Sequence, residues 1–173
     1  EELDAGDVIL KEYCEISEED TLGTLHDRLK ELGAIGLGKA LKLIEEEKVQ
    51  AEKQDETKVS FVKPITKEQT RINWDDAKEV IYNQIRGLNP FPGAHTFTET
   101  GENVKIYKSE KIDKEYEGEN GAIVEIINKK GPVVKTSNGG IILLEVKFEG
   151  KKLQSGTDIV NGRKLTIGNK FKN

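Results

Sequence analysis

The chain has 173 residues, 34% of them charged and 35% hydrophobic, with one cysteine and no methionine. Because no apolar run approaches the roughly 20 residues of a membrane-spanning helix, we expect neither a membrane span nor an export leader, and the lone Cys14 excludes an internal disulfide. The net charge of −5 is unevenly spread: residues 1–60 carry 17 acidic and 8 basic side chains, whereas residues 61–173 carry 15 and 19.

The missing methionine bears on how much of a protein the chain represents. Translation starts at methionine, whereas this chain opens with two glutamates that run directly into an ordered-looking motif. We therefore expect the chain to be part of a longer protein.

The first fifty residues are predicted to contain one strand and two helices. An apolar run followed by alternation predicts a strand over residues 7–16. A leucine stripe at spacings of three and four then predicts a helix over residues 22–32, which is expected to stop at Gly33. A second helix is expected over residues 35–47. Because these elements cannot bury a core alone, residues 1–50 are interpreted as an α/β remnant, the end of a Rossmann-like domain.

The middle of the chain changes character. Residues 51–72 are polar and show no sustained period, so they are predicted to form an extended linker. An apolar face with helical spacing then predicts a helix that begins near Asp75 or Asp76 and ends near Gly87. The Pro-Phe-Pro-Gly run of residues 90–93 prevents this helix from continuing.

Short β segments separated by turn-forming pairs occupy the rest of the chain. Asn138-Gly139 is the clearest hairpin signal among them. Several short antiparallel strands in so few residues predict an all-β barrel of oligonucleotide-binding type. The third domain is therefore residues 73–173, a helix followed by this barrel. The expected strands are residues 94–99, 103–109, 121–128, 132–136, 141–148 and 164–168.

The charge of this last domain suggests a partner. From Asn120 to the end there are 10 basic and 4 acidic residues. A basic surface of this kind favours a polyanionic partner such as a nucleic acid. A solvated, lysine-rich surface without any partner explains the same composition.

Several segments carry more specific motifs. The segment Leu-Asp-Ala-Gly-Asp-Val-Ile-Leu at residues 3–10 precedes Asp-Thr-Leu-Gly-Thr-Leu-His-Asp-Arg-Leu at residues 20–29. Gln54-Asp55, then Arg-Ile-Asn-Trp at residues 71–74, and then Ile-Arg-Gly-Leu-Asn-Pro-Phe-Pro-Gly-Ala at residues 85–94 follow in order. Together these motifs resemble the C-terminal part of the methionyl-tRNA formyltransferase family.

The resemblance implies a reaction: transfer of a formyl group from 10-formyltetrahydrofolate to the α-amino group of methionyl initiator tRNA, in translation initiation. An Asn, a His and an Asp act in the family, and the matching Asp is Asp4, a catalytic position that orients the His and stabilises its protonated form. Leu3 and Gly6 are implied to lie beside the folate. The family's Asn and His lie upstream, and His26 and His95 do not replace them, so we expect the chain to be inactive alone.

The resemblance also implies that the linker and barrel contact tRNA. Lysines and arginines suit this task because phosphate contacts position a nucleic acid without reading its sequence. The barrel's aromatic residues are scattered in sequence, so no base-stacking platform and only nonspecific binding are expected. The tRNA-binding candidates are Lys63, Lys67, Arg86, Lys129, Lys130, Lys135, Lys151 and Lys152.

Two alternatives stay open at this point. One is a folate-dependent formyltransferase that acts on a nucleotide-linked amino sugar, because such enzymes resemble the tRNA enzyme in both domains. The other is a stand-alone tRNA-binding module. In the favoured reading we expect a cytoplasmic monomer with no metal ion and no membrane partner.

Overall fold

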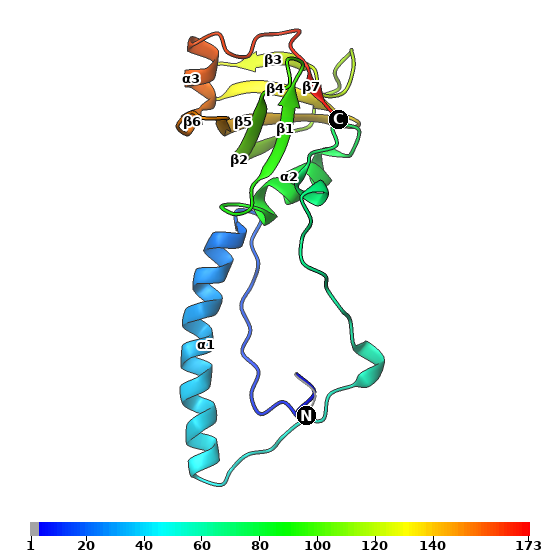
Figure 1. The fold of residues 1–173 in the computed structure, drawn as a ribbon. Helices are drawn as coiled ribbons and strands as arrows, with labels where there is room; N and C mark the ends of the chain where they lie inside the picture. Colours follow the sequence, from blue (N-terminus) through cyan, green and yellow to red (C-terminus); the bar gives the residue numbers. More distant parts are fainter. Residues whose placement is uncertain (1–3) are drawn as a thin grey trace. The chain divides into compact units, whose positions relative to one another are not determined.

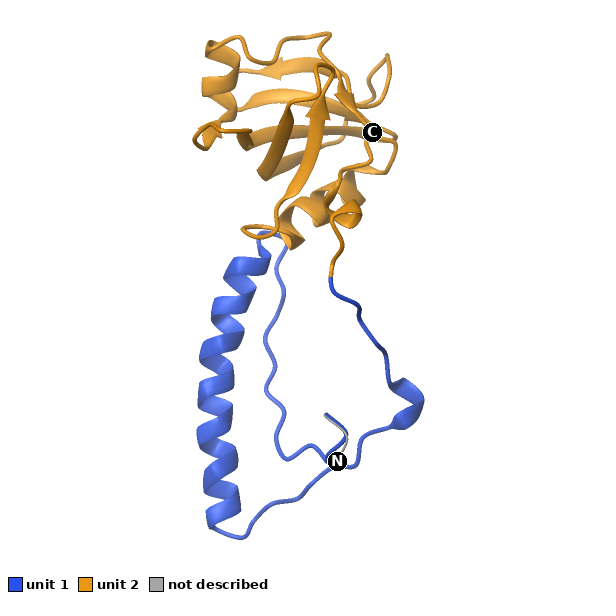
Figure 2. Cartoon of the chain, viewed as in Figure 1, with its two compact units in different colours: residues 1–64 blue, residues 65–173 orange. Residues whose placement is uncertain are grey.

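The computed structural model describes residues 4–173, so Leu3 lies outside the described residues. The chain divides into two compact units, residues 1–64 and residues 65–173, which are coloured separately in Figure 2. The boundary falls inside the segment expected to be a linker, which also holds two short 3-10 helices, η1 (Glu56–Lys58) and η2 (Glu68–Thr70). Of the helices in residues 4–173, none combines the length and apolar composition needed to cross a bilayer.

The first unit is dominated by one long helix, α1 (Leu22–Glu45). It begins at a capping box in which Thr21 and Thr24 each accept a hydrogen bond from the other's backbone N–H. The prediction of two helices separated at Gly33 was wrong, because the helix passes through this glycine. A helical glycine costs only about 1 kcal/mol relative to alanine, which the good helix formers on either side offset.

The strand expected over residues 7–16 was also wrong. In the described residues this segment is extended but makes only an isolated antiparallel bridge between Val8 and Glu52, whose backbone groups exchange two 2.9 Å hydrogen bonds. Alternation of apolar and polar residues indicates an extended segment with one apolar face. Such a segment forms part of a sheet only if a neighbouring strand pairs with its backbone hydrogen-bonding groups. The described residues of the first unit therefore contain no sheet of the kind that a Rossmann-like domain has.

The first α-helix of the second unit is α2 (Lys78–Gly87), close to the predicted bounds. Asn138 caps it from a distant hairpin, because its Oδ1 accepts the N–H of Lys78 at 2.8 Å. Ile81, Ile85 and Leu88 bury the apolar face that the sequence indicated. The helix ends before the proline-rich turn, as expected.

A curved antiparallel sheet forms the rest of this unit, as Figure 1 shows. Hydrogen-bonded neighbours follow the order β3-β4-β5-β2-β1-β7, with β6 paired to β5. The two ends of this order are linked, because Ala122 bridges Lys170 and the N–H of Phe171 donates to the carbonyl oxygen of Gly121. The strands are β1 (Ala94–Thr98), β2 (Asn103–Ile112), β3 (Ile123–Ile127), β4 (Gly131–Thr136), β5 (Gly139–Phe148), β6 (Gln154–Ser155) and β7 (Phe171–Lys172).

Five of the six expected strands are present, and the sixth is not. Residues 164–168 form a turn-rich segment, and the last strand is instead β7. The short helix α3 (Gly156–Asn161) was not predicted, although Ser155 and Asp158 form a capping box that the sequence displays. Six residues are too few to show a helical period, so only this capping pattern could have revealed the helix.

Trp74 lies at the centre of the core of this unit. Its side chain is fully buried, its ring stacks on Phe171 with centroids 5.7 Å apart, and its indole N–H donates to the hydroxyl of Thr96 at 3.0 Å. These contacts join the segment before α2 to the first and last strands of the sheet. The buried side chains around it come from α2, β1, β2, β3, β4, β5, α3 and β7.

A glycine pair allows α3 to pack directly on the sheet. The Cα atoms of Gly131 and Gly156 approach each other, and a β-carbon added at Gly156 would lie well inside van der Waals contact with the carbonyl oxygens of Leu143 and Lys130. Both obstacles are backbone atoms, so no side-chain rotation relieves the clash.

We therefore predict that Gly156→Ala lowers the free energy of unfolding by about 2 kcal/mol, as overpacking in a rigid core does. Urea denaturation followed by the fluorescence of Trp74, the only tryptophan, measures this change. Gly87→Ala is the matched control, because a β-carbon at Gly87 meets nothing within 4 Å. Equal stability of the two variants would contradict the packing argument.

Candidate nucleic-acid interface

Four of the predicted tRNA-binding lysines lie in two turns of the sheet. Lys129 and Lys130 form the β3–β4 turn, where Lys129 has the left-handed φ of 62°, and Lys151 and Lys152 lie in the turn between β5 and β6. All four are exposed. The Nζ of Lys130 is held by both carboxylate oxygens of Glu110, at 2.6 and 2.7 Å, so its charge is partly neutralised within the protein.

Two further candidates are held by neighbouring side chains. Lys135 on β4 is half-buried and donates to the Oδ1 of Asn120 at 2.7 Å. Arg86, in the last turn of α2, donates from Nε to Asn83 at 2.8 Å and lies over the ring of Tyr82. The remaining candidate outside the clefts, Lys63, belongs to the first unit and is exposed.

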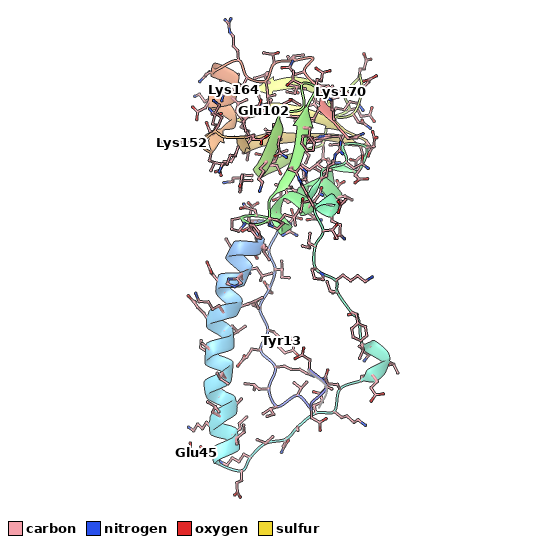
Figure 3. All side chains as sticks on the ribbon, viewed as in Figure 1. Tyr13, Glu45, Glu102, Lys152, Lys164 and Lys170 are labelled. Atoms are coloured by element: carbon pink, nitrogen blue, oxygen red, sulfur yellow. The ribbon has the colours of Figure 1, made fainter. Side chains whose placement is uncertain are left out.

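Lys151, one of the turn lysines, lines a cleft together with two other lysines. We name it the Phe148 cleft; it measures about 400 Å³ and is lined by Phe148, the β1–β2 turn and part of the 164–171 segment. Lys151, Lys164 and Lys170 line it together with Glu99 and Glu102. Figure 3 labels Glu102, Lys152, Lys164 and Lys170 on this unit. Because both signs of charge are present, the cleft is only weakly attractive for an anion.

The charges of this cleft are also engaged within the chain. Lys164 lies over the ring of Phe148, with Nζ 5.1 Å from the centroid, and donates to Gln154 at 2.6 Å. Lys170 pairs with Glu119, which raises the pKa of Lys170 and lowers that of Glu119. The sequence analysis named neither lysine, because the two are brought to the cleft by the fold of the last segment.

A second cleft, of about 520 Å³, has a different charge character. It contains Lys67, a predicted candidate, and Lys105, which was not predicted. Of the described residues, those that line it include no Asp or Glu. We name it the His95 cleft and define it by its lining: residues 65–67, Thr70, residues 91–93, His95, Asn103 and Lys105.

Phe91 at the mouth of this cleft is the aromatic residue that the sequence analysis missed. Its side chain is 76% exposed although it lies between two prolines. Only the aromatic residues of the barrel were considered for base stacking, and Phe91 belongs to the turn before the first strand. The Pro-Phe-Pro sequence itself could have revealed it. A turn that ends a helix lies at the surface, so a phenylalanine in that turn does not serve the core and indicates a binding role.

His95 forms the floor of the cleft and is only 6% exposed. Its Nδ1 lies 3.1 Å from the hydroxyl of Thr70. Burial lowers the pKa of His95, and the positive charges of Lys67, Arg71 and Lys105 lower it further, against the opposing effect of a hydrogen bond to the backbone of Thr70. The ring is therefore neutral at pH 7.

The predicted catalytic position, Asp4, lies in the first unit. It is exposed and has a left-handed φ of 61°. The side-chain amide of Gln54 donates to the carbonyl oxygens of Asp4 and Gly6, at 2.8 and 2.7 Å, and so holds the turn from both sides. His26, on α1, pairs with Asp27 instead. Within residues 4–173 no group of three or more His, Cys, Asp or Glu side chains is placed to hold a metal ion.

Comparison with known proteins agrees with these motifs. The family described as formyl transferase, C-terminal domain, matches residues 64–164. A methionyl-tRNA formyltransferase of Fusobacterium nucleatum is 50% identical over 99% of this chain and 55% of its own length. One of Bacillus subtilis is 41% identical over 97% of this chain and 53% of its own. The chain thus spans about half the length of the curated relatives it matches, and the resemblance found in the sequence is confirmed.

A solved structure shares the fold. The crystal structure of HypX from Aquifex aeolicus in complex with tetrahydrofolic acid superposes with a TM-score of 0.69 over 92% of this chain and 28% of that one. The two sequences are only 16% identical, so the likeness concerns the fold alone.

The environment of His95 generates a pH prediction. Because its folded pKa lies below the ordinary value of about 6.5, the unfolded chain binds the proton first as the pH falls. The free energy of unfolding should therefore decrease below about pH 6.5, by at most about 1.4 kcal/mol per pH unit, and be unaffected by this group above it. In urea denaturation between pH 5 and 8, His95→Gln should flatten this dependence and His26→Gln should retain it; an unchanged slope in His95→Gln would contradict the assignment.

Proposed function

Because this chain belongs to the formyl transferase C-terminal domain family, we propose that it is the tRNA-binding end of a methionyl-tRNA formyltransferase. The observation that carries the proposal is the 50% identity, over nearly the whole chain, with a relative of that name. In this proposal the complete protein transfers a formyl group from 10-formyltetrahydrofolate to methionyl initiator tRNA in the cytoplasm, as a monomer.

The second unit is proposed to bind the tRNA. Its sheet is small, antiparallel and curved with linked edges, which supports an oligonucleotide-binding type of barrel. Exposed lysines in two turns and a cleft without acidic lining supply positive charge. Such contacts hold the phosphates of a nucleic acid in place and make the affinity depend on salt.

The first unit is proposed to be the end of the α/β catalytic domain, followed by the linker. The exposure of α1 supports this proposal, because none of its residues is buried by the described part of the chain. Six of its large apolar residues are each between 44% and 61% exposed, which is costly for an isolated helix and ordinary for one that covers a sheet. The exposed set comprises Leu22, Leu29, Ile35, Leu37, Leu41 and Ile44.

Asp4 is proposed to act through a histidine that this chain does not contain. Formyl transfer releases a proton from the methionyl amine, and a carboxylate beside the accepting histidine orients its ring and stabilises its protonated form. Asp4 and Gly6 are both exposed. In this proposal Asp4 and Gly6 form one open edge of the folate site.

The role of Asp4 is testable in the complete protein. Asp4→Asn should lower kcat by about 100-fold or more, the usual size of a proton-transfer contribution, with tRNA affinity unchanged. Because the carboxylate raises the histidine's pKa, the acid limb of the pH profile of kcat/KM should move to lower pH in the variant. Wild-type turnover, or a uniform loss without any shift of the profile, would remove Asp4 from this role.

The tRNA proposal is testable on the chain itself. Lys151→Gln with Lys152→Gln should weaken binding of initiator tRNA by about tenfold and lower the slope of log affinity against log salt by about one unit per lysine. Fluorescence anisotropy over 50–300 mM salt measures both.

The control is Lys30→Gln with Lys42→Gln, which removes the same charge from α1. If the two double variants weaken binding equally, the effect is one of net charge. If the unaltered chain does not bind tRNA, the proposal for the second unit is wrong.

A further inference from the structure

We propose that the His95 cleft binds one unpaired nucleotide of the RNA, with its base against Phe91 and its phosphate between Lys67 and Lys105. The inference rests on the proposed tRNA-binding function and adds to it a specific subsite. It also replaces the expectation that the unit lacks any stacking platform.

The ring of Phe91 has the exposure and the support that base stacking requires. It is 76% exposed at the mouth of a cleft whose volume of about 520 Å³ lies in the usual range for small-ligand sites. The turn beneath it is fixed: Asn89 donates to the carbonyl oxygen of Tyr107 at 2.8 Å, and the N–H of Gly93 donates to that of Leu88 at 2.9 Å. A ring on a fixed support loses little entropy when a base stacks on it.

Positive charge converges on the same space. Lys67 and Lys105 both line the cleft. Lys67 lies at the N-terminal end of η2 and Lys105 lies on β2. The Nζ of Lys105 donates to the carbonyl oxygen of Pro92, another lining residue, at 2.8 Å. A carbonyl partner leaves the ammonium charge unneutralised, in contrast to the carboxylate partners of Lys130 and Lys170. Glu68 belongs to the same segment but not to the lining, and its carboxylate accepts a hydrogen bond from Thr66.

His95, which lines the cleft, offers a hydrogen-bond acceptor. The hydroxyl of Thr70 donates to the carbonyl oxygen of Lys67 at 2.8 Å, so it must accept from the Nδ1 of His95. We therefore assign the proton of the neutral ring to Nδ1, which leaves Nε2 as an acceptor. A nucleotide supplies matching donors, namely the ribose 2′-hydroxyl and the base N–H groups.

The walls of the cleft are held in place by α2. The side-chain amide of Gln84 donates to the carbonyl oxygens of Gln69 and Arg71, both at 2.9 Å, and so fixes the segment that carries Lys67 and Thr70. The N–H of Ile72 donates to the carbonyl oxygen of His95 at 2.8 Å and joins this segment to β1. The site is therefore built before any ligand arrives. A paired base lies inside its duplex and cannot stack on Phe91, which is why an unpaired nucleotide is inferred.

The test uses the full 173-residue chain and two probes, a fluorescein-labelled six-nucleotide oligouridylate and initiator tRNA. Phe91→Leu should weaken oligouridylate binding about tenfold, the effect of losing one stacked base, without changing the salt slope. Phe91→Tyr, which restores a ring, should bind as the unaltered chain does. Lys67→Gln with Lys105→Gln should instead lower the salt slope by about 0.7, because each neutralised phosphate of a single strand contributes about 0.7 and both lysines face one phosphate.

Two measurements keep the outcome unambiguous. The emission of buried Trp74 reports whether each variant is folded. In NMR titration with oligouridylate, the ring signals of His95 should shift and those of exposed His26 should not. Wild-type affinity in Phe91→Leu, or shifts that bypass His95, would overturn the inference.

The tRNA probe separates this inference from the proposed function. If the chain binds tRNA but not oligouridylate, and Phe91→Leu leaves tRNA binding intact, the nucleotide subsite is wrong and the tRNA-binding proposal stands. If neither probe binds, both fail. Lys30→Gln with Lys42→Gln again controls for net charge.

Discussion

The burial of Trp74 is the constraint on which the second unit depends. One side chain contacts Phe171 of β7 through its ring and Thr96 of β1 through its N–H, and the chain on either side of it leads to the 65–72 segment and to α2. Burying so large an aromatic surface while satisfying its one polar atom contributes several kcal/mol. The same packing places the 65–72 segment beside β1, which is the arrangement that creates the His95 cleft.

Charge in this unit is best understood by asking what each lysine contacts. Lysines beside carboxylates, such as Lys130 and Lys170, belong to exposed ion pairs of small energetic value. Lys105 instead has a carbonyl partner and shares a cleft with Lys67. Net charge of a segment therefore indicates the class of partner, whereas the partner of each ammonium group decides where an anion is attracted.

The elements that could be predicted are those whose signal is local. α2 and five strands follow from helical spacing, alternation and the Pro-Phe-Pro-Gly stop, because each pattern acts within a few residues. The break at Gly33 and the strand at residues 7–16 failed because glycine only weakens a helix and a strand needs a partner elsewhere. Likewise, Lys151 and Lys67 were found as basic residues, whereas Phe91 and Lys105 became site residues only through their neighbours in space.

By itself the sequence determined the family, the order of helix and strands in the second unit, and the identities of Asp4 and the turn lysines as candidates. These depend on motifs and short-range periodicity, which survive without knowledge of the fold. Only the tertiary structure decided that α1 is continuous, that the sheet's edges are linked, and that three segments distant along the chain line the His95 cleft. The physical reason is that a cleft is formed by segments distant along the chain, brought together by burial of a shared core that no local pattern specifies.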